Sequence, residues 1–253
     1  MFLLALAGKP ALAAAPAEAE PQAPADFTVL ADESLRIPLT RIARDYTVRT
    51  KASLTLWFAS AGRMTDSIRE GADADIVITA DDDALKALEF SGQIDVYATQ
   101  AIVSSPLVLA VVGDTDRKGR EAGLGFMNWR YRDGAPLRLV VIDATHSLEQ
   151  RLSEQALTRS ELLRARSLAP VHVATSAQAI AAMKREDIPG LLLAVDVFSR
   201  ENLQVAQRFS TVATYKAAVL AGERMAASRD FIAWLHSEEA RLLFTQFGLS
   251  AVE

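Results

Sequence analysis

From about residue 26 onward, short apolar runs alternate with segments in which apolar residues recur every three or four positions. The runs predict buried strands, because a strand inside a parallel sheet is covered on both faces. The spaced segments predict amphipathic helices. Strands that alternate with helices are typical of parallel α/β architecture, so we expect an α/β fold in which helices flank mostly parallel sheets.

The first strand and helix already contain candidate binding chemistry. Residues 28–31 predict a buried strand, and residues 35–48 have apolar side chains at helical spacing. Between them, Asp32, Glu33 and Ser34 form the expected turn and helix cap. Open α/β sheets bind ligands at such turns, where the helix offers free N–H groups that suit an anion. The two carboxylates at this turn oppose an anion, so the ligand chemistry needs a further argument.

Small polar residues follow other predicted strands at the points where helices begin. They are Ser60, Ser147, Thr175 and Ser176, and His146 lies beside Ser147. Serine and threonine are common helix caps, so each residue alone has a structural explanation. Their shared position after strands makes them candidates for one ligand cleft.

Composition limits the classes of function. The chain has 253 residues with 50% hydrophobic content, enough for one large body or two lobes. Its net charge of −5 argues against a nucleic-acid partner, which usually requires a basic face. The absence of cysteine removes disulfides, thiolate nucleophiles and cysteine-type zinc sites.

Residues 1–25 differ in composition from the rest of the chain. A short apolar run is followed by Ala11-Leu12-Ala13 and then by a tail rich in alanine, proline and glutamate. This order is typical of the later part of a secretory signal with its cleavage site, followed by a flexible linker. A disordered alanine-rich leader is the alternative. No later run is long enough to predict a transmembrane helix.

Four segments carry a resemblance to a known family. They are residues 28–35 (TVLADESL), 58–64 (FASAGRM), 68–81 (IREGADADIVITAD) and 231–249 (FIAWLHSEEARLLFTQFGL). Together they make the chain similar to the periplasmic molybdate-binding proteins of ABC importers. With a weaker middle part, the resemblance covers most of residues 26–250.

The resemblance implies a type II periplasmic-binding-protein-like fold. Each lobe would be a mixed, mostly parallel sheet flanked by helices, with the ligand cleft between the lobes. Residues 26–105 and 212–253 would form lobe 1, and residues 106–211 lobe 2, after the leader and linker at 1–25.

The resemblance also implies a periplasmic monomer that binds an oxyanion of the molybdate or tungstate type through hydroxyls and main-chain N–H groups. The partner would be an ABC transporter permease, and the protein would meet the membrane only through it. No cofactor, metal or catalytic residue is implied.

The first ligand-binding positions carry over unevenly. Ser34 matches the family's first binding serine. The second binding serine corresponds to Ala61, so its hydroxyl is lost unless the neighbouring Ser60 replaces it. A segment that contributes main-chain N–H groups falls near Glu149, which places a carboxylate there.

The ligand-binding positions that lie later in the chain differ more from the family's pattern. A main-chain contact of the family falls on Ser176, which adds a hydroxyl. The binding tyrosine corresponds to Ala194, and we expect Tyr215 to lie too far along the chain to replace it. Two alanines that precede the first serine in the family are Asp32 and Glu33 here.

These departures leave two interpretations of the acidic residues open. Asp32, Glu33 and Glu149 could face solvent as ordinary acids at helix starts. Alternatively, they remodel the cleft for a cationic or neutral small organic solute, because a buried carboxylate beside a dianion is costly.

Two other classes of function remain as alternatives. An enzyme that processes small molecules would need a base such as His146, for which the sequence shows no partner, and no nucleophile-elbow, P-loop or dinucleotide motif is present. An effector-sensing lobe of a transcriptional regulator shares the two-lobed fold, but a DNA-binding helix-turn-helix is missing and the leader is typical of export.

Overall fold

The computed structural model describes residues 27–94, 99–113, 136–144, 147–159, 167–200, 202–222 and 224–252. The expected leader at 1–25 and the candidate His146 lie outside the described residues. Within these ranges, no helix is long and apolar enough to cross a membrane.

The described strands form one mixed sheet. They are β1 (Phe27–Asp32), β2 (Leu54–Ala59), β3 (Ile76–Thr79), β4 (Gln100–Val112), β5 (Leu137–Ile142), β6 (Leu168–Val173), β7 (Gly190–Leu193), β8 (Leu203–Val219) and β9 (Ser250–Ala251). Their order across the sheet is β2-β1-β3-β8-β4-β7-β5-β6, with β9 paired to β4. The strands within the group β2-β1-β3 are parallel to one another, as are those within the group β7-β5-β6. β4 and β8 pair antiparallel with each other, β8 pairs antiparallel with β3, and β4 pairs antiparallel with β7.

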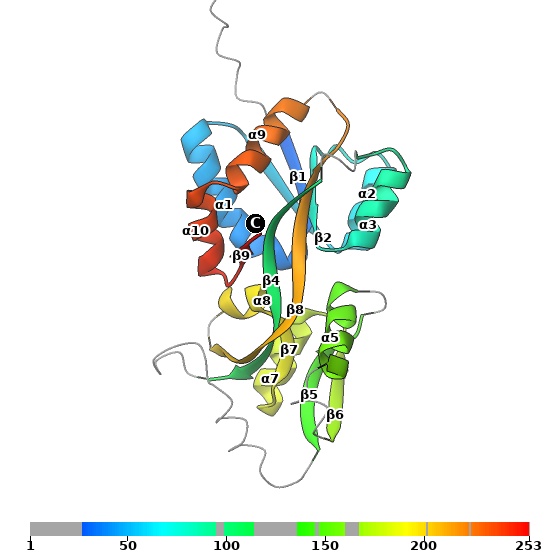
Figure 1. Cartoon of the computed structure of the whole chain (residues 1–253), viewed down its shortest axis with the longest axis vertical. Helices are drawn as coiled ribbons and strands as arrows, with labels where there is room; N and C mark the ends of the chain where they lie inside the picture. Colours follow the sequence, from blue (N-terminus) through cyan, green and yellow to red (C-terminus); the bar gives the residue numbers. More distant parts are fainter. Residues whose placement is uncertain are drawn as a thin grey trace, which may run out of the picture.

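The helices lie on both faces of this sheet. They are the 3₁₀ turn η1 (Glu33–Leu35), α1 (Arg36–Thr50), α2 (Ala61–Arg69), α3 (Asp82–Phe90), α5 (Leu148–Arg159), α7 (Ser176–Glu186), α8 (Ala194–Phe198), α9 (Met225–Leu235) and α10 (Glu238–Gln246). In Figure 1, α1 and α10 flank the upper strands on one side, and α2 and α3 flank them on the other.

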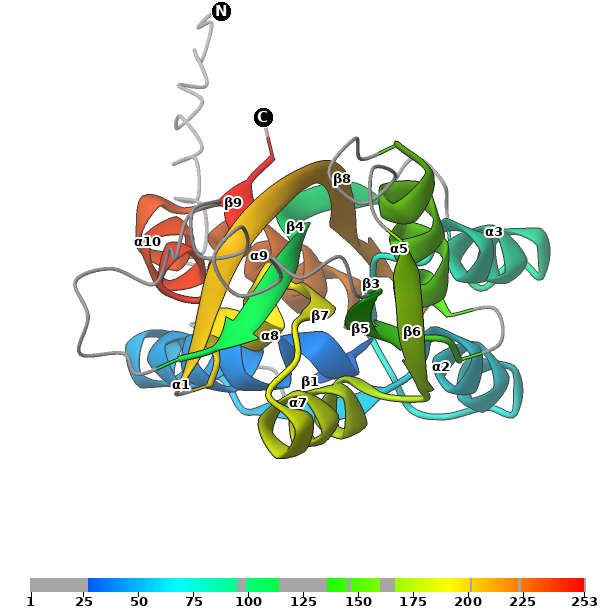
Figure 2. The same ribbon diagram turned by 90° about the horizontal axis from the view of Figure 1, so that it is seen from below.

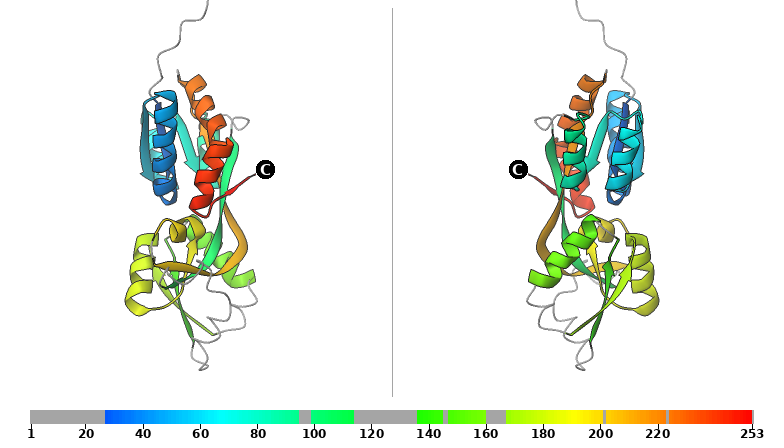
Figure 3. Two further views of the ribbon diagram at one scale, coloured as in Figure 1. Left: turned by 90° about the vertical axis from the view of Figure 1, so that its left-hand side faces the viewer. Right: turned by 90° about the vertical axis from the view of Figure 1, so that its right-hand side faces the viewer.

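The long strands β4 and β8 join two lobes. Figure 1 and the side views in Figure 3 show β4 and β8 running from the part with β1, β2 and β3, here called lobe 1, into the part with β5, β6 and β7, called lobe 2. Their pairing shifts register between Pro106 and Val108. The predicted lobe boundaries at 105/106 and 211/212 therefore fall inside continuous strands, and the boundaries themselves stay a prediction.

Each lobe has helices packed on both faces of its strands. In lobe 1, Leu39 of α1 and Phe231 of α9 pack on one face, and Met64 of α2 and Leu88 of α3 pack on the other. In lobe 2, Met183 of α7 belongs to a cluster with β5 and β7. Seen from below in Figure 2, α7 and α5 lie on opposite sides of the strands of lobe 2. This layering confirms the predicted α/β class.

One predicted element ends in the wrong place. The apolar run 191–195 predicts a strand, but β7 ends at Leu193 and the short helix α8 begins at Ala194. Residues 191–195 are all buried and all apolar, so the change from strand to helix leaves no periodic signal in this run. The prediction for residues 194 and 195 is therefore wrong.

Candidate functional site

The carboxyl ends of the parallel strands of both lobes point toward the same stretch of β4 and β8. In lobe 1, the last residue of β3, Thr79, pairs with Lys216 of β8. In lobe 2, the last residue of β7, Leu193, pairs with Leu107 of β4. Because β4 pairs Ser104 with Thr214 between these points, only a few residues of the shared strands separate the two strand ends. Ligands of open α/β sheets bind at such ends.

In lobe 1, the turn after β1 places Ser34 against the carboxylate of Asp32. The Ser34 N–H donates to Asp32 Oδ1 at 3.3 Å, and the Ser34 hydroxyl donates to the same oxygen at 3.1 Å. The Thr79 hydroxyl donates to Asp32 Oδ2 at 3.5 Å. Asp32 thus caps η1 and accepts hydrogen bonds from η1 and β3.

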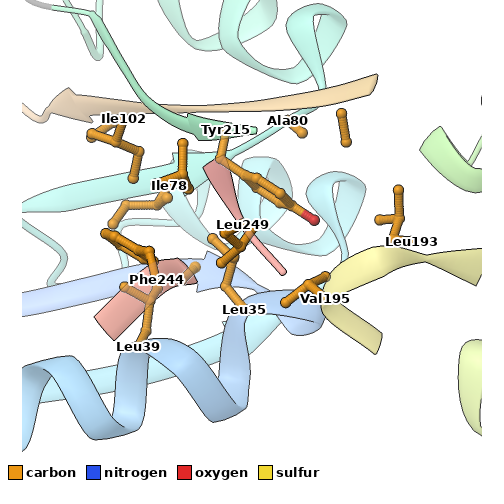
Figure 4. Packing of buried hydrophobic residues seen from close by; sticks show 14 of the residues in the cluster. Leu35, Leu39, Ile78, Ala80, Ile102, Leu193, Val195, Tyr215, Phe244 and Leu249 are labelled. Atoms are coloured by element: carbon orange, nitrogen blue, oxygen red, sulfur yellow. The ribbon is translucent and has the colours of Figure 1, made fainter. Parts of the chain in front are cut away.

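A buried tyrosine completes this group. The Tyr215 hydroxyl lies 2.7 Å from Ser34 Oγ. Because the single hydroxyl proton of Ser34 is directed to Asp32, Tyr215 is the donor of this bond. Figure 4 shows the Tyr215 ring beside Leu249, with its oxygen at the end that faces Leu193 and Val195. Tyr215 therefore reaches Ser34, although we expected it to lie too far along the chain to replace the family's binding tyrosine; that replacement itself stays a prediction.

In lobe 2, Asp196 accepts a serine hydroxyl hydrogen bond, as Asp32 does in lobe 1. The Ser176 hydroxyl at the start of α7 donates to Asp196 Oδ2 at 3.1 Å. Arg200 donates to Asp196 Oδ1 at 2.8 Å. Asp196 is 4% exposed, so its charge is compensated inside the protein by Arg200 and not by water.

The carboxylates of the two lobes act on one another. Burial and, to a smaller extent, the charge of Asp196 together raise the pKa of Asp32 to about 6, against the hydrogen bonds from Ser34. Burial and the charges of Asp32 and Asp196 together raise the pKa of Glu149 to about 7. Burial also raises the pKa of Asp196. Asp32, Glu149 and Asp196 therefore form one acidic cluster that spans both lobes.

A pocket of about 290 Å³ opens beside this cluster. Its walls include Glu33, Ser34, Arg36 and Ile37 from lobe 1 and Ser176, Asp196 and Arg200 from lobe 2. Of the acidic cluster only Asp196 lines the pocket, and Asp32 contacts it through Ser34. Ser199 also lines it, and the buried Ser199 Oγ has no hydrogen-bond partner in the described part of the chain. Across the described ranges, no group of three histidine or acidic side chains is arranged to hold a metal ion.

Other candidate residues have structural roles. Thr175 caps α7 by accepting from the Gln178 N–H, and Ser147 caps α5 by accepting from the Gln150 N–H. Glu33 is exposed at the pocket mouth, where it pairs with Arg36 at 2.7 Å.

Three further candidates supply no side-chain contact to the cluster. Ser60 is exposed and its side chain makes no capping bond, although it precedes α2. Ala61 begins α2, and Ala194 is a fully buried residue at the start of α8. Binding by any of the candidates remains a prediction.

Two residues of the site, Asp196 and Thr79, are not among the candidates predicted from the sequence. Asp196 follows an apolar run, as Asp32 does, and so has the same kind of position in the sheet. Thr79 ends β3 in the same way. Both could have been found from their position at strand ends.

Comparison with known proteins gives a family match over nearly the whole described chain. Residues 27–250 match the model of the family described as bacterial extracellular solute-binding protein. The molybdate-binding protein ModA of Haemophilus influenzae is 26% identical over 241 residues, which cover 90% of this chain and 91% of that protein.

Solved structures share the fold at low sequence identity. A substrate-binding domain from Clostridium difficile, assigned to a molybdenum ABC transporter, superposes with a TM-score of 0.73 at 20% identity, covering 90% of this chain and 100% of that one. The sulfate-binding protein SubI of Mycobacterium tuberculosis gives a TM-score of 0.68 at 12% identity, covering 90% of this chain and 88% of that one. At these identities the likeness shows the fold and not the ligand.

Proposed function

Because the chain belongs to the bacterial extracellular solute-binding proteins, we propose that it captures one small solute between its lobes and delivers it to an ABC importer. In this proposal the protein is exported to the periplasm, works as a monomer and meets the membrane only through the permease. Solute capture would stabilise one arrangement of the lobes, which the permease then recognises.

One observation carries the proposal. The 290 Å³ pocket has walls from both lobes, with Ser34 after β1 on one side and Ser176 at the start of α7 on the other. A solute held there contacts both lobes at once, so its binding energy depends on how the lobes are placed.

A molybdate-type oxyanion is the ligand that the relatives' names favour. The resemblance to that family leads us to expect binding groups at Ser34 and Ser176. The same two hydroxyls, however, donate to Asp32 and Asp196 in this chain. An oxyanion is therefore the second candidate for the solute.

A role in catalysis has less support than binding. The Asp32 carboxylate that accepts from the Ser34 hydroxyl also accepts from the Ser34 N–H and the Thr79 hydroxyl, so its contacts are those of a helix cap and not of a base dedicated to one nucleophile. We therefore propose binding without a chemical step.

Ligand-induced stabilisation tests the proposed function. A solute at 100 times its dissociation constant stabilises the protein by about 2.7 kcal/mol, which a thermal melt detects. Ala177 lines the pocket, so Ala177→Trp should fill it and abolish the stabilisation. The exposed Ala72 lies outside the pocket lining, and Ala72→Trp should leave the stabilisation unchanged. Stabilisation that survives in Ala177→Trp would place the solute elsewhere and contradict the proposal.

A further inference from the structure

Resting on the proposed function, we propose that the solute is a small organic cation, a molecule with an ammonium or guanidinium group.

In lobe 1, the donors that an oxyanion would need are already in use. The Ser34 N–H and the Ser34 hydroxyl both point at Asp32 Oδ1, at 3.3 and 3.1 Å. The Tyr215 hydroxyl proton goes to Ser34 in turn. The Asp32 carboxylate therefore occupies the position of an anionic ligand in this turn, and an oxyanion would have to displace it from its donors.

Lobe 2 repeats the arrangement with one difference. The Ser176 hydroxyl donates to Asp196, so an internal carboxylate again takes the donor. Here Arg200 lies 2.8 Å from the other carboxylate oxygen and balances the charge. The Asp196–Arg200 pair therefore has a net charge close to zero, and a ligand does not need to supply a charge that balances it.

Among the residues that line the pocket, Glu33 pairs with Arg36 and Asp196 pairs with Arg200, so these charges balance. The negative charge that is left beside the pocket belongs to Asp32, which accepts from the pocket-lining Ser34, and to Glu149, which the Asp32 charge affects. Neither forms an ion pair with a described residue, and the charges that act on their pKa values are those of other carboxylates. A dianion placed beside them would add to this repulsion, at a cost of several kcal/mol. A cation would reduce it and would hold both carboxylates in their ionised form.

The size of the site favours an organic cation over a metal ion. A metal such as Mg²⁺ or Ca²⁺ needs several oxygens within about 2.6 Å of one point. Both oxygens of Asp32 and both oxygens of Asp196 already accept hydrogen bonds from separate groups. The pocket of about 290 Å³, with Ile37 and Ala177 among its lining residues, has the dimensions and apolar surface of a small-molecule site.

Titration calorimetry on the full chain at pH 8 tests the proposal. The cationic probes are choline, ethanolamine, 1,4-diaminobutane and arginine; the oxyanions are molybdate, sulfate and phosphate; the metals are Mg²⁺ and Fe³⁺. We expect at least one organic cation to bind at one site per chain, and neither the oxyanions nor the metals to bind there. Asp32→Asn and Glu149→Gln, which keep the side-chain shape, should each weaken this binding at least tenfold. Asp66→Asn removes an exposed carboxylate of α2 and should leave it unchanged.

Several results would overturn the proposal. Binding of an oxyanion or a metal alone, blocked by Ala177→Trp, would contradict the organic cation while leaving the proposed function intact. Cation binding that both charge-removing variants retain would contradict the role of the acidic cluster, and the use of two variants covers the case in which one fails to fold. Binding of no probe from any class would overturn the inference and the proposed function together.

Discussion

The hydroxyl oxygens of Ser34 and Tyr215 lie 2.7 Å apart although 181 residues separate them in the sequence. Ser34 belongs to the first turn of lobe 1, and Tyr215 belongs to β8, which both lobes share. The contact therefore connects the candidate binding turn directly to the strand along which the lobes are joined.

Removal of the tyrosine hydroxyl should weaken both the fold and the site. In Tyr215→Phe, Ser34 loses its donor inside a fully buried environment, which should lower the free energy of unfolding by about 1 kcal/mol. Ser34 and Asp32 are then held less firmly, so we expect solute affinity to fall several-fold. Urea denaturation and calorimetry measure the two effects.

Tyr46→Phe is the matched control. Tyr46 is also buried, but it packs against Phe231 and Trp234 in the core of lobe 1. Its variant should leave solute affinity unchanged. Equal losses of affinity in both variants would mean that the Tyr215 hydroxyl acts only through general stability.

Solute binding should weaken as the pH falls. The pKa of Glu149 is raised to about 7 and that of Asp32 to about 6, so both carboxylates take up protons between pH 8 and pH 5. A cation loses its counter-charges in this range, and its affinity should fall by at least about tenfold. Choline keeps its charge at every pH and isolates the effect on the protein. A pH-independent dissociation constant would exclude these two groups from the site.

Without ligand, the free energy of unfolding should decrease as the pH rises, whereas solute affinity should increase. In the unfolded chain Asp32 titrates near 3.8, and in the folded chain near 6, so the folded state binds more protons in between. The free energy of unfolding therefore falls as the pH rises from about 4 to about 7, and the contribution of Asp32 is about 3 kcal/mol at most. Glu149 acts in the same direction.

Urea denaturation at pH 5 and pH 8 checks this prediction. Asp32→Asn should reduce the pH dependence, whereas Asp66→Asn should preserve it. A protein that is more stable at pH 8 than at pH 5, without ligand, would contradict the assignment of raised pKa values to the cluster.

An ion pair between the lobes should affect affinity from outside the pocket. Arg151 of α5 lies 3.2 Å from the Asp81 carboxylate, which caps α3 in lobe 1. Arg151→Met removes this contact and should lower solute affinity a few-fold if the contact favours the liganded arrangement. Arg138 pairs with Glu186 within lobe 2, so Arg138→Met should have no such effect. Equal affinities of the two variants would exclude a role for the interlobe pair.

The sequence predicted the fold well where an apolar run was followed by apolar residues at helical spacing. The strand expected over 28–31 lies within β1, and the helix expected over 35–48 coincides with most of α1. The pattern failed at Ala194 and Val195, because a short helix that is buried on every side lacks an exposed face. It also could not show that β4 and β8 run through both lobes, since sheet pairing is a long-range property.

The candidate site was predictable in part. Ser34, Ser176 and the acids Asp32 and Glu149 follow from their position at helix starts. Asp196 could be found from its position at a strand end, but its contact with Ser176 could not. Tyr215 follows from no local pattern, because its contact with Ser34 joins two residues that lie 181 positions apart. The direction of each hydrogen bond, which decides between an anion and a cation, likewise exists only in the folded chain.

The central claim is that the Asp32 carboxylate takes the donors that would otherwise hold an oxyanion, and Asp32→Ala tests it most directly. Calorimetric titration of this variant with molybdate and with the organic cations should show a reciprocal change. We predict that cation binding is lost and that molybdate binding appears, because the N–H and hydroxyl of Ser34 become free. A wild-type protein that binds molybdate as tightly as the Asp32→Ala variant would contradict the claim.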